Sequence, residues 1–127
     1  MTDTPESIAA VAKRFFDAIE QGDADTIAAI YDEKVEIWHN TDRLITTRED
    51  NLKVLRGFIE RAPSRKYTDR RLTAFPGGFV QQHLLVAKQP NGKVLELPAC
   101  LVCAVKDGKI TRLDEYFDTE PLKGWAS

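Results

Sequence analysis

The chain has 127 residues, of which 43% are hydrophobic and 30% are charged, and its formal net charge is −2. This size and composition predict one soluble domain, residues 1–127, built around a single hydrophobic core. The sequence contains no basic tract interleaved with aromatic residues and no nucleic-acid-binding motif, so we do not expect a nucleic-acid partner.

Charge is unevenly distributed along the chain: residues 1–50 are rich in acids and residues 51–71 are rich in lysine and arginine. The basic segment has two interpretations, a surface that binds an anion or the solvated face of a helix. We prefer the solvated face.

The N-terminal segment lacks the pattern of a secretion signal, and no apolar run approaches the roughly 18 residues that a membrane-spanning helix needs. We therefore expect a cytoplasmic protein with no membrane partner. Cys100 and Cys103 form a C-x-x-C pattern inside a strand-like segment. Because strand residues three apart point to opposite faces, we expect two buried free thiols rather than a redox pair or a metal site.

Three helices are predicted in the first half of the chain. The first covers 6–21, begins after Thr4-Pro5 and ends at Gly22, and the second runs from Asp23 to about Tyr31. A strand, 35–38, precedes a third helix over 47–62, which Pro63 ends. The first helix has apolar residues at spacings of three and four, namely Ile8, Val11, Ala12, Phe15 and Ile19.

The second half of the chain is typical of β structure. Strands are predicted at 66–75, 79–88, 93–105 and 109–118, and the last three are joined by Asn-Gly and Asp-Gly turns. Helices followed by an antiparallel meander predict an α+β fold in which three helices pack on one face of a curved antiparallel sheet.

Strand alternation predicts which side chains share the face beneath the helices. In 94–105 the odd positions are continuously apolar, so odd residues should face inward, and the same test turns Glu115 inward between Leu113 and Phe117. A carboxylate at such a place is costly unless it is paired or protonated, which makes it either structural or functional. In 79–88 we favour the even residues, including Gln82 and Leu84, as the inward set.

The stretch from Ala18 to Trp38, AIEQGDADTIAAIYDEKVEIW, and the closing DGKITRLDEYFD resemble the nuclear-transport-factor-2-like superfamily, specifically its SnoaL-like branch. Ketosteroid isomerase, limonene-epoxide hydrolase and polyketide cyclases share this cone-shaped α+β fold. The resemblance covers nearly the whole chain and implies a pocket for a small apolar molecule, and a homodimer formed through the convex sheet face. Residues expected on that face are Gln81, His83, Cys100, Val102 and Tyr116.

The resemblance also suggests site residues. Aligned on the isomerase, His39 takes the place of the aspartate base, but Phe15 replaces the oxyanion tyrosine and Cys100 lies near the place of the second donor. Aligned on the hydrolase, Glu115 takes the place of one carboxylate, and Trp38 and Asn40 match the tyrosine and asparagine that position water. Gln82 and Leu84 stand where the hydrolase has arginine and aspartate, so its relay cannot be assembled.

These residues lead to two hypotheses. The first is a cofactor-independent acid/base enzyme of isomerase, hydrolase or cyclase type, in which His39 and Glu115 move protons. Asn40 and Gln82 would hold the polar end of the substrate, and the apolar wall would include Trp38, Leu84, Leu97, Phe117 and Phe15. The second is a non-catalytic module that binds an apolar ligand or only dimerises. For single residues structural alternatives remain: a histidine bonded to a carbonyl, an asparagine of a turn, Glu115 paired with Gln82 or Arg14, and a His83–Asp114 pair on the dimer face.

No metal, nucleotide or serine-nucleophile motif occurs in the sequence, and its two histidines are far apart. We therefore expect neither a cofactor nor a metal.

Overall fold

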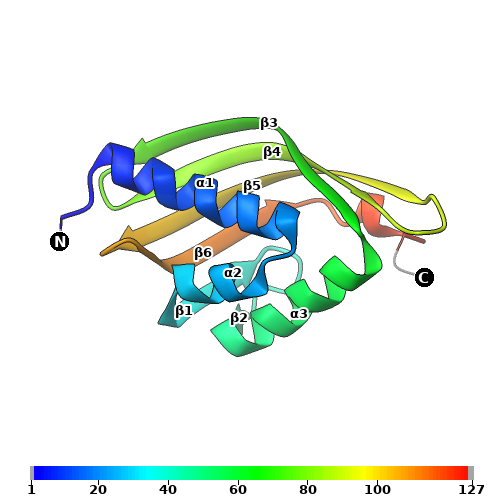
Figure 1. Ribbon diagram of the computed structural model, residues 1–127, viewed down its shortest axis with the longest axis horizontal. Helices are drawn as coiled ribbons and strands as arrows, with labels where there is room; N and C mark the ends of the chain where they lie inside the picture. Colours follow the sequence, from blue (N-terminus) through cyan, green and yellow to red (C-terminus); the bar gives the residue numbers. More distant parts are fainter. Residues whose placement is uncertain (1, 126–127) are drawn as a thin grey trace.

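The computed structural model describes residues 2–125, so Met1, Ala126 and Ser127 of the predicted domain lie outside the described residues. Three helices lie along one face of a curved six-stranded sheet (Figure 1). The predicted α+β architecture is confirmed. The helices are α1 (Pro5–Gln21), α2 (Ala24–Ile30), α3 (Arg48–Arg61) and a short 3-10 helix, η1 (Glu120–Leu122); the strands are β1 (Tyr31–His39), β2 (Ile45–Thr46), β3 (Ser64–Phe75), β4 (Gly78–Lys88), β5 (Val94–Lys106) and β6 (Lys109–Phe117).

The strands follow the order β2-β1-β6-β5-β4-β3 across the sheet. Strands β3 to β6 form the predicted antiparallel meander, whereas β1 joins the sheet parallel to β6. This parallel pairing sets His39 opposite Glu115 in the register, so residues 76 positions apart in the chain end up side by side. The sequence did not predict β2 or η1.

The helix ends follow the predicted signals. Thr4 and Ser7 form a reciprocal capping box at the start of α1, and Gly22 ends the helix with a φ of 73°, a left-handed conformation that glycine adopts without strain. Asp23 caps α2 through the Thr26 amide. The second helix is shorter than predicted, because Tyr31 already has extended backbone angles and starts β1.

The predicted inward face is right for β5 and β6 and wrong for β4. Leu95 to Val105 are buried at odd positions, and so is Leu113. In β4, however, the odd residues are the buried set, so Gln81 and His83 face the helices, while Gln82 is exposed and Leu84 lies on the outer face. The expected dimer-face assignment of Gln81 and His83 is therefore also wrong.

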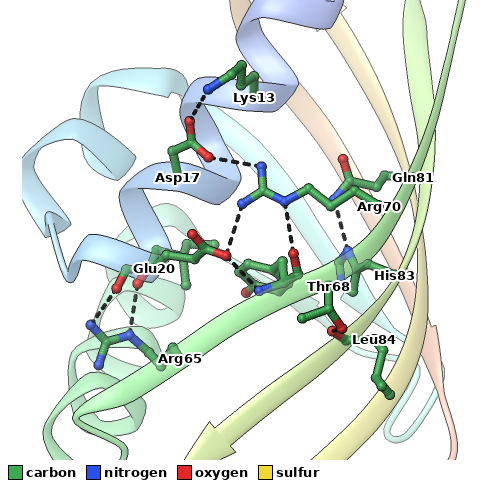
Figure 2. Close-up of polar contacts among 11 residues, drawn as sticks. Lys13, Asp17, Glu20, Arg65, Thr68, Arg70, Gln81, His83 and Leu84 are labelled. Atoms are coloured by element: carbon green, nitrogen blue, oxygen red, sulfur yellow. Dashed lines mark hydrogen bonds and ion pairs between the residues drawn. The ribbon is translucent and has the colours of Figure 1, made fainter.

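The interpretation of the basic segment as a solvated helix face fails at Arg65 and Arg70. Arg65 is buried and donates to the backbone carbonyls of Ile19 and Glu20 in α1 and of Ile59 and Ala62 at the end of α3. One guanidinium thus satisfies carbonyls of the last turns of two helices, which lack the usual acceptor role within the helix. Figure 2 shows its two contacts with the end of α1.

Arg70 lies at a β-bulge of β3, where the register shifts between Thr68 and Arg71 and Asp69 has a φ of 54°. Its guanidinium lies 2.9 Å from an Asp17 oxygen and 3.1 Å from a Glu20 oxygen, both on α1 (Figure 2). Because a bulge bends the strand and redirects a side chain, it brings this arginine to the helix. Together Arg65 and Arg70 fix α1 over β3.

Candidate active site

A cavity of about 340 Å³ lies between the helices and the inner face of the sheet. This volume is within the range of small-molecule sites. Most of its wall is apolar: α1 contributes Phe15, Phe16 and Ile19, α3 contributes Val54, Leu55 and Phe58, the sheet contributes Leu85, Leu95, Leu97, Leu101, Leu113 and Phe117, and the C-terminal segment contributes Leu122 and Trp125. The predicted wall residues Phe15, Leu97 and Phe117 are among them.

The two predicted proton-transfer residues are in contact and both line the cavity. His39 Nε2 lies 3.0 Å from Glu115 Oε1, and about a quarter of each side chain is exposed, 25% for His39 and 23% for Glu115. The hydrogen bond to Glu115 raises the pKa of His39 above the usual value for histidine, although partial burial opposes the shift. The partner of Glu115 is thus His39, and neither Gln82 nor Arg14, the alternatives considered for it, pairs with its carboxylate.

His83 adds a second histidine to the cavity wall, which the sequence analysis had assigned to the opposite face. Its Nδ1 lies 2.9 Å from the Gln81 amide nitrogen (Figure 2). Because that amide nitrogen only donates, Nδ1 accepts and the neutral ring carries its proton on Nε2. Burial lowers the pKa of His83 to about 4, so the ring is neutral at ordinary pH. The His83 ring packs at 4.5 Å from the Tyr67 ring, measured between centroids.

Four other predicted ligand-binding residues lie outside this cavity. Gln82 and Leu84 belong to the outer face of β4, since the strand alternates opposite to our expectation. Trp38 also lies on the outer face, where its ring packs against Tyr116 at 5.3 Å. Asp114 bonds Arg112 there, so the expected His83–Asp114 pair does not form.

Asn40, the fourth, is exposed and holds the end of β6 instead. Its side-chain oxygen accepts from the Phe117 amide at 3.0 Å, and its side-chain nitrogen donates to the Phe117 carbonyl at 3.1 Å. Its backbone amide donates to the Glu115 carbonyl at 3.0 Å. Asn40 thus extends the pairing of β1 with β6 by one residue and positions the backbone that carries Glu115.

Sequence reasoning missed several polar residues of the wall. Tyr31, Asn51, Arg61, Tyr67 and His83 all line the cavity. Burial raises the pKa of both tyrosines, so their hydroxyl groups stay protonated. Asn51 is the fourth residue of α3, and its place four residues before Leu55 of the apolar stripe was the signal in the sequence. Asparagines that are buried, as this one is, are uncommon and are hydrogen-bonded when they occur.

Residues 2–125 contain no group of three or more histidine, cysteine or acidic side chains arranged to hold a metal ion. None of their helices has the length and apolar character needed to cross a membrane. Cys100 and Cys103 are free and lie on opposite faces of β5, as predicted, but only Cys103 is buried, because Cys100 lies half-buried on the outer face.

Comparison with known proteins identifies the fold. The chain superimposes with a TM-score of 0.83 on a candidate polyketide cyclase from Xanthomonas campestris, at 21% identity over 97% of this chain and 98% of the other. It matches an epoxide hydrolase of LEH-like type from M. tuberculosis at a TM-score of 0.78 and 22% identity, over 97% and 91% of the two chains. A candidate ketosteroid isomerase from Kribbella flavida matches at 0.69 and 22%, over 93% and 82%.

Identities at this level show a shared fold and leave the reaction open. No curated protein sequence matches the chain. The model of the SnoaL-like domain, by contrast, matches residues 12–113, which is most of the sequence. The chain belongs to the SnoaL-like family of the nuclear-transport-factor-2-like superfamily.

Proposed function

We propose that this protein is a cofactor-independent acid/base enzyme acting on a small apolar molecule that bears a carbonyl, hydroxyl or epoxide group. The observation that carries the proposal is the His39–Glu115 contact of 3.0 Å at the wall of an otherwise apolar cavity. Paired titratable groups in a cavity are the usual carriers of proton transfer, and a partly desolvated site strengthens their interaction with a substrate.

The chemistry follows from the two side chains. The Glu115 carboxylate takes a proton from a carbon next to a carbonyl, or from water or a hydroxyl group. His39 is bonded to that carboxylate and holds it in one orientation. His39 also accepts the proton from Glu115 or returns one to the substrate, so that the site regains its starting protonation. His83 contributes a neutral N–H donor elsewhere on the wall. The apolar lining selects the body of the substrate, and Phe15, Leu97 and Phe117 contribute to it.

Proton exchange at carbon tests this proposal directly. 2-Acetylnaphthalene is an apolar ketone with acidic methyl protons, and their replacement by deuterium in D₂O is followed by proton NMR. We expect the wild type to accelerate exchange, Glu115→Gln to reduce the protein-dependent rate by about 100-fold or more, and His39→Gln to reduce it as well. Glu96→Gln, which removes an exposed carboxylate from the outer face of β5, serves as the matched control and should leave the rate unchanged.

The outcomes separate catalysis from binding. Tight binding of the ketone without any protein-dependent exchange would favour a non-catalytic ligand-binding module. Equal exchange rates in the wild type and Glu115→Gln would remove Glu115 from the mechanism.

We also propose that the protein forms a homodimer through the outer sheet face and works in the cytoplasm. The outer face carries half-buried and exposed apolar side chains, including the Trp38–Tyr116 pair, Cys100 and Val102. Burial of these groups against a second copy would remove apolar surface from water. Light scattering at micromolar concentration should give a dimer for the wild type and a monomer for Tyr116→Arg; a monomeric wild type would contradict the proposal.

A further inference from the structure

Asn51 is a buried residue in the first turns of α3, with 6% of its surface exposed. The Tyr31 hydroxyl donates to Asn51 Oδ1 at 2.8 Å. Tyr31 is buried at the start of β1, packs against Phe15 and keeps its proton, because burial and the nearby Glu115 charge raise the pKa of its hydroxyl. The amide is therefore held in a single orientation, with its oxygen occupied.

The amide nitrogen of Asn51 remains, with two N–H donors. No side-chain or backbone acceptor within residues 2–125 bonds to it, and Trp125 Nε1 is the sole side-chain donor in that range that is both sealed from solvent and unpartnered. Asn51 Nδ2 is thus not sealed. Since Asn51 lines the cavity and is otherwise buried, the cavity is the space to which this donor is open.

The position of Asn51 relative to the proton-transfer pair defines what it can do. Asn51 belongs to a helix, whereas His39 and Glu115 belong to strands β1 and β6, so the donor and the base lie on different walls of one cavity. An apolar ligand between the walls can accept a hydrogen bond from the helix side while it presents a proton to the sheet side. A carbonyl compound has this arrangement, with its oxygen and its acidic C–H on adjacent carbons.

We propose that Asn51 Nδ2 binds the carbonyl oxygen of the substrate, and that Tyr31 is the positioning residue that orients the amide. The inference rests on the proposed function and narrows its substrate class to carbonyl compounds. When Glu115 takes the proton, the C–H bond breaks, its electron pair forms a C=C bond to the carbonyl carbon, and the π pair of the C=O bond moves to the oxygen. The resulting enolate oxygen is hydrogen-bonded by Asn51, and the step reverses when a proton returns to carbon or oxygen.

Two probes of matched shape test the contact. 2-Acetylnaphthalene carries a carbonyl oxygen, and 2-isopropenylnaphthalene has a CH₂ group in its place. The ratio of their dissociation constants, measured for each protein by fluorescence titration, reports the contribution of the oxygen. For Asn51→Leu we expect the preference for the ketone to fall by about threefold to tenfold relative to the wild type, the worth of one hydrogen bond, with little change for the alkene.

Four further variants separate binding from folding. Asn51→Asp keeps an acceptor for the Tyr31 hydroxyl but removes the amide donor, and should lose the ketone preference. Tyr31→Phe releases the amide and should weaken the preference partially, whereas the double variant Tyr31→Phe/Asn51→Leu leaves no buried group unpaired and covers the case in which Asn51→Leu does not fold. Val54→Ala trims the apolar wall and should weaken both probes equally.

The carbonyl stretch of ¹³C-labelled 2-acetylnaphthalene gives a readout that a structural role would not move. It should shift to lower frequency in the wild type and return toward its apolar-solvent value in Asn51→Leu. The proposal is overturned if the ratio of the ketone and alkene dissociation constants is the same in the wild type, Asn51→Leu and Asn51→Asp. It is likewise overturned if Asn51→Leu weakens the binding of both probes equally. If the wild type shows no protein-dependent deuterium exchange but Asn51→Leu still reduces the preference for the ketone, the proposed catalysis is refuted and the Asn51 contact stands.

Discussion

His83 should make the protein acid-sensitive in a pH window that the structure specifies. Burial lowers the pKa of His83 to about 4 from an ordinary value of 6.5, with the Arg70 charge adding to the shift and the Glu115 charge opposing it. The unfolded chain therefore binds more protons than the folded protein between these two values. The free energy of unfolding of the protein therefore falls as the pH drops from about 6.5 to about 4.

The magnitude follows from the size of the shift. One pH unit corresponds to about 1.36 kcal/mol, so the full effect of His83 is about 3 kcal/mol, of which about 2 kcal/mol is lost between pH 7 and pH 5. His39 acts with the opposite sign. Because its pKa is raised in the folded protein, its contribution is present below the unfolded value and is lost as pH rises through the folded value.

The assay compares the wild type with His83→Asn by urea unfolding at about pH 7 and about pH 5. An asparagine oxygen can accept from the Gln81 amide as His83 Nδ1 does, but the asparagine does not titrate. We expect the variant to lose about 2 kcal/mol less than the wild type on acidification, and the contribution of His39 cancels because both proteins retain it. Parallel losses in the two proteins would refute the assignment of a buried neutral histidine.

Three other predictions concern the contacts that support the site. Arg65→Met should lower the free energy of unfolding by about 2–4 kcal/mol in urea titrations, because the last-turn carbonyls of α1 and α3 lose a shared donor. The control Lys66→Met, at an exposed neighbouring position, should change the free energy of unfolding by no more than about 0.5 kcal/mol. Asn40→Ala should cost about 1–3 kcal/mol and speed hydrogen exchange of the Phe117 amide, since that amide loses its acceptor; unchanged exchange there would contradict the role of Asn40. Glu115→Gln should return the pKa of His39 toward the usual histidine value in an NMR titration, because the carboxylate is the main cause of the upward shift; an unchanged His39 titration would mean that another group causes it.

Local patterns were sufficient to predict the helices and the meander. The Thr4-Pro5 start and Gly22 end of α1, and the Asn-Gly and Asp-Gly turns, act through backbone conformations that neighbouring residues decide. The inward direction of Glu115 was predictable for a similar reason. One face of β5 is continuously apolar, and β6 shows the same alternation at Leu113.

The face of β4 that is buried was not predictable in this way. Its even residues Val80, Leu84 and Val86 are as apolar as its odd ones, because the outer face of the sheet is itself partly apolar. The polar residues Gln81 and His83 are tolerated inside because they bond to each other, and because the His83 ring packs against Phe16 and Tyr67. The ring partners of His83 belong to α1 and β3, so the residue pattern of β4 alone does not reveal them.

The sequence by itself determined the three main helices, the strands of the meander, the fold class and the presence of an inward carboxylate near the end of the last strand, since these depend on periodicity and turn chemistry over a few residues. The tertiary structure decided the composition of the site. The parallel pairing of β1 with β6 brings His39 to Glu115, and the packing of α3 brings Asn51 to Tyr31. These contacts join residues that are distant in the chain, and they form only when whole helices and strands pack together. Because this packing is cooperative, no short segment of the sequence predicts it.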